Sequence, residues 1–183
     1  MQYHPYIWAA HWSNGKRFDF GHLDAFTFNH VAPGRTFTGG RPPQPPLSVD
    51  INVGFSHHCF TNGRKNPDFN PGDIYNFPSD SRSFCPIRYQ HTIDFDLRSF
   101  VQQLPSKRCF RTNQANHFSI VGQLSKKAGY YVAFFRMEAC SAVQPYAVNL
   151  MIESAYIKPT LPITGKGAYN EAFLAIVTRV LGI

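Results

Sequence analysis

The strictest pattern in this chain is the alternation of apolar and polar side chains over residues 47–55, LSVDINVGF. Every second residue from Leu47 to Phe55 is apolar, and the residues between them are polar or small. Successive side chains of a strand point to opposite faces of a sheet, so this period of two predicts a half-buried β-strand. Aromatic residues make up 15% of the 183 residues, which favours sheet packing over a helical bundle.

Three later segments also predict strands. Residues 118–124 and 146–157 alternate, whereas residues 130–137 are apolar on both faces, as in a central strand covered on both sides. Near the N-terminus, Asn14-Gly15 predicts the turn of a hairpin. The segments 32–46 and about 62–83 carry many proline, glycine and Asn/Asp turn signals, and we expect both to be long loops.

Helical spacing appears in DFDLRSFVQQLP, where apolar residues stand at positions 97, 100, 101 and 104. This spacing predicts a packed helix over about 95–104, with Asp94 or Asp96 at its start and Pro105 at its end. The tail YNEAFLAIVTRVLGI favours a C-terminal helix, although its β-branched residues also permit a strand. We therefore expect an α+β fold, with a largely antiparallel sheet of six to eight strands, in a single domain spanning 1–183.

Targeting signals and membrane segments are not expected from the sequence. The first residues lack the basic and apolar regions of a secretory signal, and no apolar run approaches the roughly 20 residues of a membrane helix. The four cysteines form no CxxC pair and each stands beside apolar residues, which favours buried, reduced thiols. These features predict a cytoplasmic protein with no membrane partner.

Positive charge is concentrated in one part of the chain. The formal net charge is +7, and residues 82–127 hold eight basic residues against two acidic ones. Basic groups mixed with aromatic and amide side chains suit a phosphate backbone with exposed bases, so we expect RNA as the partner. The candidate nucleic-acid-binding residues are Tyr89, Arg98, Lys107, Arg108, Arg111, Lys126 and Lys127.

The alternation of residues 47–55 runs into His57-His58-Cys59. If the strand keeps its register, His57 points into the core and His58 points to the open face beside Asp50 or Asn52. Histidine is the side chain whose ordinary pKa lies nearest neutrality, which makes the exposed one a candidate acid or base.

The remaining chemistry favours RNA cleavage without a metal or other cofactor. The chain has no P-loop, GxSxG or HExxH motif and no paired carboxylates for two-metal chemistry. Cleavage by 2′-OH attack needs only a base, an acid and a cation beside the phosphate. The candidate catalytic residues are His58 as acid or base, Glu153 as base, Arg88 as phosphate clamp, His91, and Tyr156.

The C-terminal half resembles a known class of ribonucleases. Over about residues 94–158, a helix is followed by the strands HFSIVGQL, YYVAFFRM and YAVNLMIESAYIK. This order resembles the barnase–EndoU–colicin–RelE class of small metal-independent ribonucleases, found among toxins and phage-encoded nucleases. The resemblance implies functional roles for Ser154 and Tyr156 near the end of the last strand. It also implies an endoribonuclease of a bacterial toxin or mobile-element system, for which an antitoxin is a possible protein partner.

Two alternatives remain open at the level of the sequence. His57 or His58 with Cys59, Cys85 and Cys109 offers four nitrogen and sulfur ligands for zinc, although structural zinc sites usually draw their ligands in close pairs. The chain also fits a non-catalytic nucleic-acid- or protein-binding module, such as a phage-type regulator or inhibitor.

Overall fold

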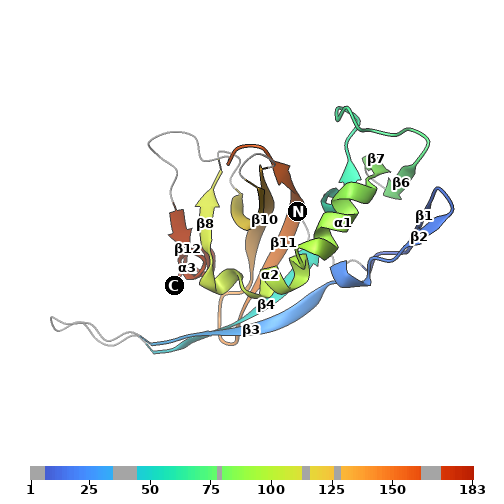
Figure 1. The fold of residues 1–183 in the computed structure, drawn as a ribbon. Helices are drawn as coiled ribbons and strands as arrows, with labels where there is room; N and C mark the ends of the chain where they lie inside the picture. The colour runs from blue at the N-terminus through green and yellow to red at the C-terminus, as the bar shows by residue number, and fades with distance from the viewer. Residues whose placement is uncertain (1–6, 35–44, 78–79, 113–115, 126–128, 162–169) are drawn as a thin grey trace.

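The fold was analysed in a computed structural model, which describes residues 7–34, 45–77, 80–112, 116–125, 129–161 and 170–183. In these residues the main sheet has seven strands in the order β12-β8-β9-β10-β11-β4-β3 (Figure 1). All neighbours pair antiparallel except β11 and β4, which pair in parallel. The largely antiparallel α+β fold is therefore confirmed. The strands are β3 (Phe26–Ala32), β4 (Leu47–Phe55), β8 (Arg108–Arg111), β9 (His117–Ser125), β10 (Gly129–Ser141), β11 (Tyr146–Lys158) and β12 (Asn170–Ala172).

Two small sheets flank the main sheet. The predicted hairpin joins β1 (His11–Ser13) to β2 (Lys16–Phe18), and its turn residues Asn14 and Gly15 adopt positive φ values of 50° and 74°. The second small sheet has the order β5-β7-β6, built from Thr61–Asn62, Asp80–Phe84 and Ile74–Phe77. The expectation of one long loop over 62–83 was therefore wrong, because two short strands with no apolar alternation pair within it. The loop expected over 32–46 lies mostly outside the described residues.

Both predicted helices are present. α2 (Leu97–Gln102) lies inside the range 95–104, and the Asp96 carboxylate caps it by accepting a hydrogen bond from the Ser99 amide at 3.1 Å. α3 (Phe173–Leu181) buries Phe173 and Ile176. A helix that was not predicted, α1 (Pro86–Asp94), precedes α2 and begins with a proline, which suits the first turn of a helix.

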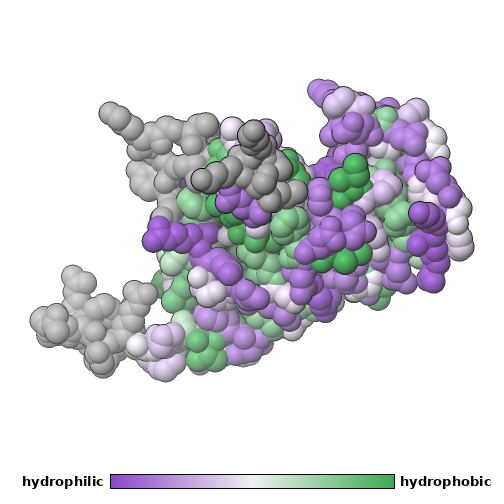
Figure 2. All heavy atoms as spheres, in the orientation of Figure 1, coloured by the Kyte–Doolittle hydropathy of each residue, from purple (hydrophilic) through white to green (hydrophobic). Residues whose placement is uncertain are grey.

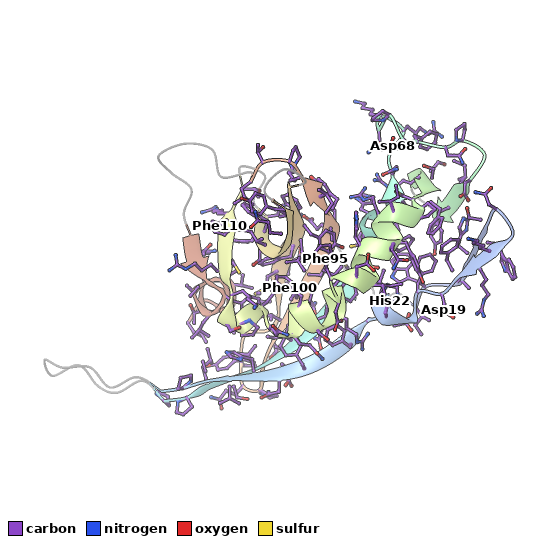
Figure 3. The ribbon with its side chains drawn as sticks, viewed as in Figure 1. Asp19, His22, Asp68, Phe95, Phe100 and Phe110 are labelled. Atoms are coloured by element: carbon purple, nitrogen blue, oxygen red, sulfur yellow. The ribbon has the colours of Figure 1, made fainter. Side chains whose placement is uncertain are left out.

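The core lies between one face of the main sheet and the helices (Figures 1 and 3). Tyr131 of β10 is fully buried there, and the Phe95 ring stacks on it with a centroid distance of 4.7 Å. Gly122 of β9 makes this stacking possible, since a Cβ at that position would lie 2.6 Å from the Phe95 ring. The helices thus cover one face of the sheet by direct contact with β9 and β10.

An irregularity in the β10–β11 pairing determines which side chains point away from this core. Phe134 pairs with Ser154 but Phe135 pairs with Ile152, so Glu153 is the extra residue of a β-bulge. Beyond the bulge, Tyr156 shares the sheet face of Phe134, opposite to the face of the buried Phe135.

Among the described residues, no helix has the length and apolar character needed to cross a membrane.

Candidate functional site

The site begins where β4 ends. After Phe55 the chain leaves the strand and enters a short 3₁₀ helix, His57–Cys59. Ser56 makes two hydrogen bonds at the start of this turn. Its amide donates to the Ile152 carbonyl at 2.9 Å, and its hydroxyl accepts from the His58 amide at 3.2 Å. A serine that bonds the backbone two residues on favours a turn over a continued strand.

This turn determines where the side chains of His57 and His58 lie. His57 is buried at 6% exposure, as predicted, and His58 is half-buried and lines a cavity. The reason given for the prediction was wrong, however, because the strand register does not continue past Phe55. His58 consequently does not lie beside Asp50 or Asn52, which are not part of that cavity.

The cavity has a volume of about 740 Å³. It lies between the end of β11 and the segment that carries β5, β6 and β7, and Figure 2 shows the surface hollowed between these two parts. Its lining includes histidines and arginines, namely His58, Arg82, Arg88 and His91. It also includes amides and carboxylates, namely Asn14, Asn62, Asn66, Asp68, Asn70 and Asp73. The β11 residues that line it are Ser154, Tyr156 and Ile157.

Thr61 holds both arginines in place. Its carbonyl accepts a hydrogen bond from Arg88 Nη1 at 2.6 Å, and its hydroxyl accepts one from Arg82 Nε at 2.8 Å. The same hydroxyl donates to the His57 carbonyl at 2.8 Å, which fixes Thr61 against the 3₁₀ helix. Thr61 thereby anchors two arginines that line the cavity.

Arg88 is held on a second side by Tyr156, whose ring centroid lies 4.9 Å from the guanidinium carbon. Burial lowers the pKa of Arg88 from its ordinary value. Its Nε is buried and makes no hydrogen bond to any described residue. A buried donor without a protein partner is uncommon and calls for a functional or solvent explanation.

His91 lies one helical turn after Arg88, so both side chains leave the same face of α1. Burial lowers the pKa of His91, with Arg88 lowering it further and Asp94 opposing the shift. This shift favours the neutral imidazole, the form that a general base requires.

The buried thiol of Cys59, next to His58 in the chain, is poorly suited to act as a nucleophile. Burial raises the pKa of the Cys59 thiol to about 12, so it stays protonated at neutral pH. Cys109 is also buried, Cys85 is half-buried, and Cys140 is exposed, which corrects the expectation that all four cysteines are buried. All four are free thiols.

No metal centre is formed by the described side chains. They include no group of three or more His, Cys, Asp or Glu residues able to hold a metal ion. The zinc alternative, which combined a histidine with Cys59, Cys85 and Cys109, is therefore overturned for the part of the chain that the structure describes.

A Ser-His-Asp combination borders the cavity but lacks the arrangement of a nucleophilic triad. Asp73 bonds His11 Nε2 at 2.7 Å through one carboxylate oxygen and accepts from the Ser13 hydroxyl through the other. The serine thus bonds the carboxylate directly and the histidine does not activate it. These bonds instead tie the β1–β2 hairpin to the wall of the cavity.

The sequence-predicted catalytic residues divide into two groups. His58, Arg88, His91 and Tyr156 all line the cavity. Glu153 does not: its carboxylate accepts from Asn116 at 2.8 Å and pairs with Arg136 at 3.2 Å. Glu153 is therefore engaged in the bulge of the sheet rather than at the cavity.

Two of the predicted nucleic-acid-binding residues make contacts inside the fold. Tyr89 donates its hydroxyl to the Asp19 carbonyl at 2.8 Å, and Arg98 donates to the Asp24 carbonyl at 2.9 Å. Of the others, Arg108 and Arg111 are exposed on β8 and Lys107 is half-buried before it. These three do not line the cavity, and Lys126 and Lys127 lie outside the described residues.

Sequence reasoning counted Arg82 in the basic segment 82–127 but did not select it as a site residue, and it missed the asparagines that line the cavity. The repeated Asn and Asp residues were interpreted only as turn signals, and two of them do form turns: Asn66 Oδ1 accepts from the Asp68 amide and Asn70 Oδ1 from the Gly72 amide. Figure 3 shows Asp68 at the tip of this segment. The sequence did carry one usable signal, namely the high density of asparagines close to arginines in this segment.

A family model matches residues 7–181 and is described as the YjaZ family, so the chain belongs to that family. No curated protein and no solved structure gives a match.

Proposed function

We propose that this YjaZ-family chain is an endoribonuclease that works without a metal, with the 740 Å³ cavity as its active site. The observation that carries the proposal is the convergence of two histidines and two arginines, from three separate segments of the chain, on one cavity. An acid, a base and a phosphate-binding cation are the groups that RNA cleavage by 2′-OH attack requires.

Each group has a role in the proposed step. His91, whose pKa is lowered by burial, takes the proton of the 2′-hydroxyl, and the oxygen attacks the adjacent phosphorus. The P–O5′ bond breaks, and His58 donates a proton to the leaving 5′ oxygen. Arg88, fixed by Thr61 and Tyr156, stabilises the charge of the phosphorane. The products are a 2′,3′-cyclic phosphate and a free 5′-hydroxyl.

The asparagines of the cavity suit recognition of a base. Asn66 and Asn70 line the same cavity as the arginines, and each accepts a turn hydrogen bond through Oδ1, so its Nδ2 group is the donor that a base would meet. Amide side chains pair with the Watson–Crick and Hoogsteen edges of unstacked bases, which is how proteins read single-stranded RNA. A nucleotide with its phosphate at Arg88 would present its base to these asparagines.

The order of elements also supports the proposal. α2 is followed by the antiparallel run β8-β9-β10-β11, in keeping with the resemblance to the barnase–EndoU–colicin–RelE class. The class is known from toxins and mobile elements, so we propose the same setting here, with an antitoxin as a possible protein partner.

The test is cleavage of a fluorescent single-stranded RNA in EDTA by the wild-type protein and by His91→Ala and Arg88→Ala. We expect EDTA to leave the rate unchanged and each variant to lose about 100-fold or more, because a positioned acid, base or oxyanion donor contributes at least that much. His30→Gln is the matched control, since His30 is a half-buried histidine of β3 outside the cavity. Full activity in both cavity variants would refute the assignment.

A second candidate is a non-catalytic module that binds RNA or a protein. The observation that favours it is Ile87, an apolar side chain that lines the cavity and is 69% exposed. Exposed apolar groups beside cations suit a partner surface. Such a module would bind RNA in a salt-dependent way and leave it intact, so pure folded protein that never cleaves RNA would favour this candidate.

A further inference from the structure

We infer that single-stranded nucleic acid leaves the cavity across the opposite face of the main sheet, on a ladder of four aromatic rings. The aromatic ladder consists of Phe110 of β8, Phe118 of β9, Phe134 of β10 and Tyr156 of β11. This inference rests on the proposed function for the direction of the strand, because the ladder ends at the cavity through Tyr156.

The four rings form a continuous row over adjacent strands. Phe110 and Phe118 have centroids 5.0 Å apart and planes at 19°, and Phe118 and Phe134 have centroids 5.7 Å apart and planes at 40°. Phe134 and Tyr156 follow at 5.4 Å and 17°. The pairing of Phe110 with Phe118 and of Phe118 with Phe134 puts these rings on one face of the sheet.

This face is opposite to the one that the helices cover. Phe134 lies between Ala133 and Phe135, both fully buried in the core under the helices, so its side chain leaves the other side of the strand. Phe118 is buried, whereas Phe110, Phe134 and Tyr156 keep part of their surface exposed. Figure 3 shows Phe110 on β8, toward the β12 side of the sheet.

Neighbouring rings do not cover one another fully. Carbon atoms in contact lie about 3.5–4.0 Å apart, so eclipsed rings would have centroids at that spacing. Separations of 5.0–5.7 Å with small interplanar angles instead correspond to offset rings. The three half-exposed rings, Phe110, Phe134 and Tyr156, thus leave part of a face or edge for a further aromatic group, while the buried Phe118 joins Phe110 to Phe134.

Cations lie at both ends of the ladder. Lys158 Nζ lies 5.8 Å from the Phe134 centroid and 5.6 Å from that of Tyr156, and Arg88 covers Tyr156 at the cavity end. At the other end Arg108 is exposed two residues before Phe110, on the same face of β8. A row of rings with cations beside it suits the bases and phosphates of a single strand.

Glu153 of the bulge does not cancel these positive charges. Its carboxylate is engaged by Asn116 and Arg136 and is compensated within the sheet. The surface therefore offers aromatic rings together with the cations Lys158, Arg88 and Arg108, and single-stranded nucleic acid supplies both the flat groups and the negative charges that match it.

Phe134→Leu and Phe110→Leu test the ladder, since leucine keeps apolar bulk and removes the ring. The probes are a fluorescein-labelled 2′-O-methyl RNA octamer, which cannot undergo 2′-OH attack, and a DNA octamer and a DNA duplex of the same sequence. We expect each variant to raise the Kd for both single strands about 10-fold, within the range found for loss of one stacked base. Phe28→Leu, in a stacked pair with Phe26 on β3, is the control and should bind as wild type.

The outcomes for the ladder and for the proposed function are separate. Cleavage of a dinucleotide needs only the cavity, so its rate should be unchanged in Phe134→Leu. If the wild-type protein does not cleave a dinucleotide, the proposed nuclease activity is refuted, but the octamer-binding test of the ladder still stands. Unchanged octamer affinity in both leucine variants, or duplex binding as tight as single-strand binding, would overturn the ladder.

A charge variant covers the case in which a leucine variant fails to fold. Lys158→Gln keeps the strand and removes one cation from the ladder. The slope of log Kd against log salt should fall by about 0.7 for the single strand, the change expected for one lost phosphate contact. Lys16→Gln, exposed on β2, should leave the slope unchanged. An unaltered slope in Lys158→Gln would also overturn the inference.

Discussion

The guanidinium group of Arg88 lies over the ring of Tyr156, 4.9 Å from its centroid, and joins helix α1 to the end of strand β11. The contact brings together residues 68 positions apart in the chain. Cation–π contacts of this kind contribute about 0.5–2 kcal/mol, more when the cation is desolvated. In this protein the contact also defines one edge of the cavity, since both side chains line it.

Thr61 is expected to control both stability and activity. Thr61→Val removes the hydroxyl that accepts from Arg82 Nε and donates to the His57 carbonyl, but keeps the backbone carbonyl that binds Arg88. Thr61 is fully buried, so we expect the free energy of unfolding to fall by about 1–3 kcal/mol. Urea unfolding measures this, and RNA cleavage should show a raised KM because Arg82 loses its 2.8 Å bond to the Thr61 hydroxyl and keeps the longer 3.4 Å bond to the Thr61 carbonyl. Equal stability and equal KM would contradict the role of Thr61.

His57 and His58 should respond differently to alanine. His57 is buried and packs near Trp8, with ring centroids 6.2 Å apart, so His57→Ala should destabilise the fold by about 2 kcal/mol or more. His58→Ala should keep the melting temperature and lose about 100-fold in cleavage rate, the contribution of a positioned acid or base. The comparison requires thermal melts and initial rates on the same preparations. Full activity in both variants would leave the His57–Cys59 turn without a catalytic role, and an unchanged melting temperature in His57→Ala would contradict its role in packing.

The pH dependence of cleavage should report on His91. Burial lowers the pKa of this imidazole from its ordinary value, and a base must be neutral to act, so kcat/KM should rise with pH along a limb that lies at lower pH than an ordinary histidine would give. Asp94 raises the pKa of His91, so Asp94→Asn should lower that pKa further and move the rising limb to lower pH. Rates measured from pH 4.5 to 8 test this shift. If the rising limb of the pH profile stays in place or moves to higher pH in Asp94→Asn, His91 is not the general base.

The strands of the main sheet were predictable because their side chains repeat with a period of two. β4 follows the alternation from Leu47 to Phe55, and the alternating residues Val49, Ile51 and Val53 are all buried. The helix over 95–104 was predictable for the same kind of reason, since its apolar spacing is regular and Asp96 supplies a cap. Regular burial on one face leaves a local pattern that single-sequence reasoning can detect.

The site was less predictable because non-local pairing and polar contacts build it. α1 buries only Thr92 and carries no apolar stripe, so its single local signal was Pro86 at the first turn. The parallel pairing of β11 with β4 brings the 3₁₀ helix beside the end of β11, and no local pattern encodes that pairing. The candidates His58, Arg88, His91 and Tyr156 were selected by residue type, whereas their convergence on one cavity follows from this topology.

The last prediction concerns acid stability and rests on His22. The Thr92 hydroxyl donates to the Tyr89 carbonyl at 2.6 Å, so it accepts a hydrogen bond from His22 Nε2, 2.7 Å away. Burial is the main cause that lowers the pKa of His22 from its ordinary 6.5, with nearby Asp19 opposing the shift. The folded protein therefore favours neutral His22, whereas the unfolded chain binds a proton near pH 6.5. This contribution to stability is present above pH 6.5 and is lost as the pH falls through the lower pKa of the folded state.

His22→Gln keeps a side-chain N–H for Thr92 and removes the titration. We expect the free energy of unfolding of wild type to fall more steeply between pH 7 and pH 5 than that of the variant, with the remaining slope shared by His30, His91 and His117, whose pKa values burial also lowers. Urea titrations at several pH values give both slopes. His30→Gln offers an independent measure, because burial alone lowers the pKa of His30, and it should remove a separate part of the slope. Parallel pH curves for wild type and His22→Gln would mean that His22 is protonated as readily in the folded state as in the unfolded chain.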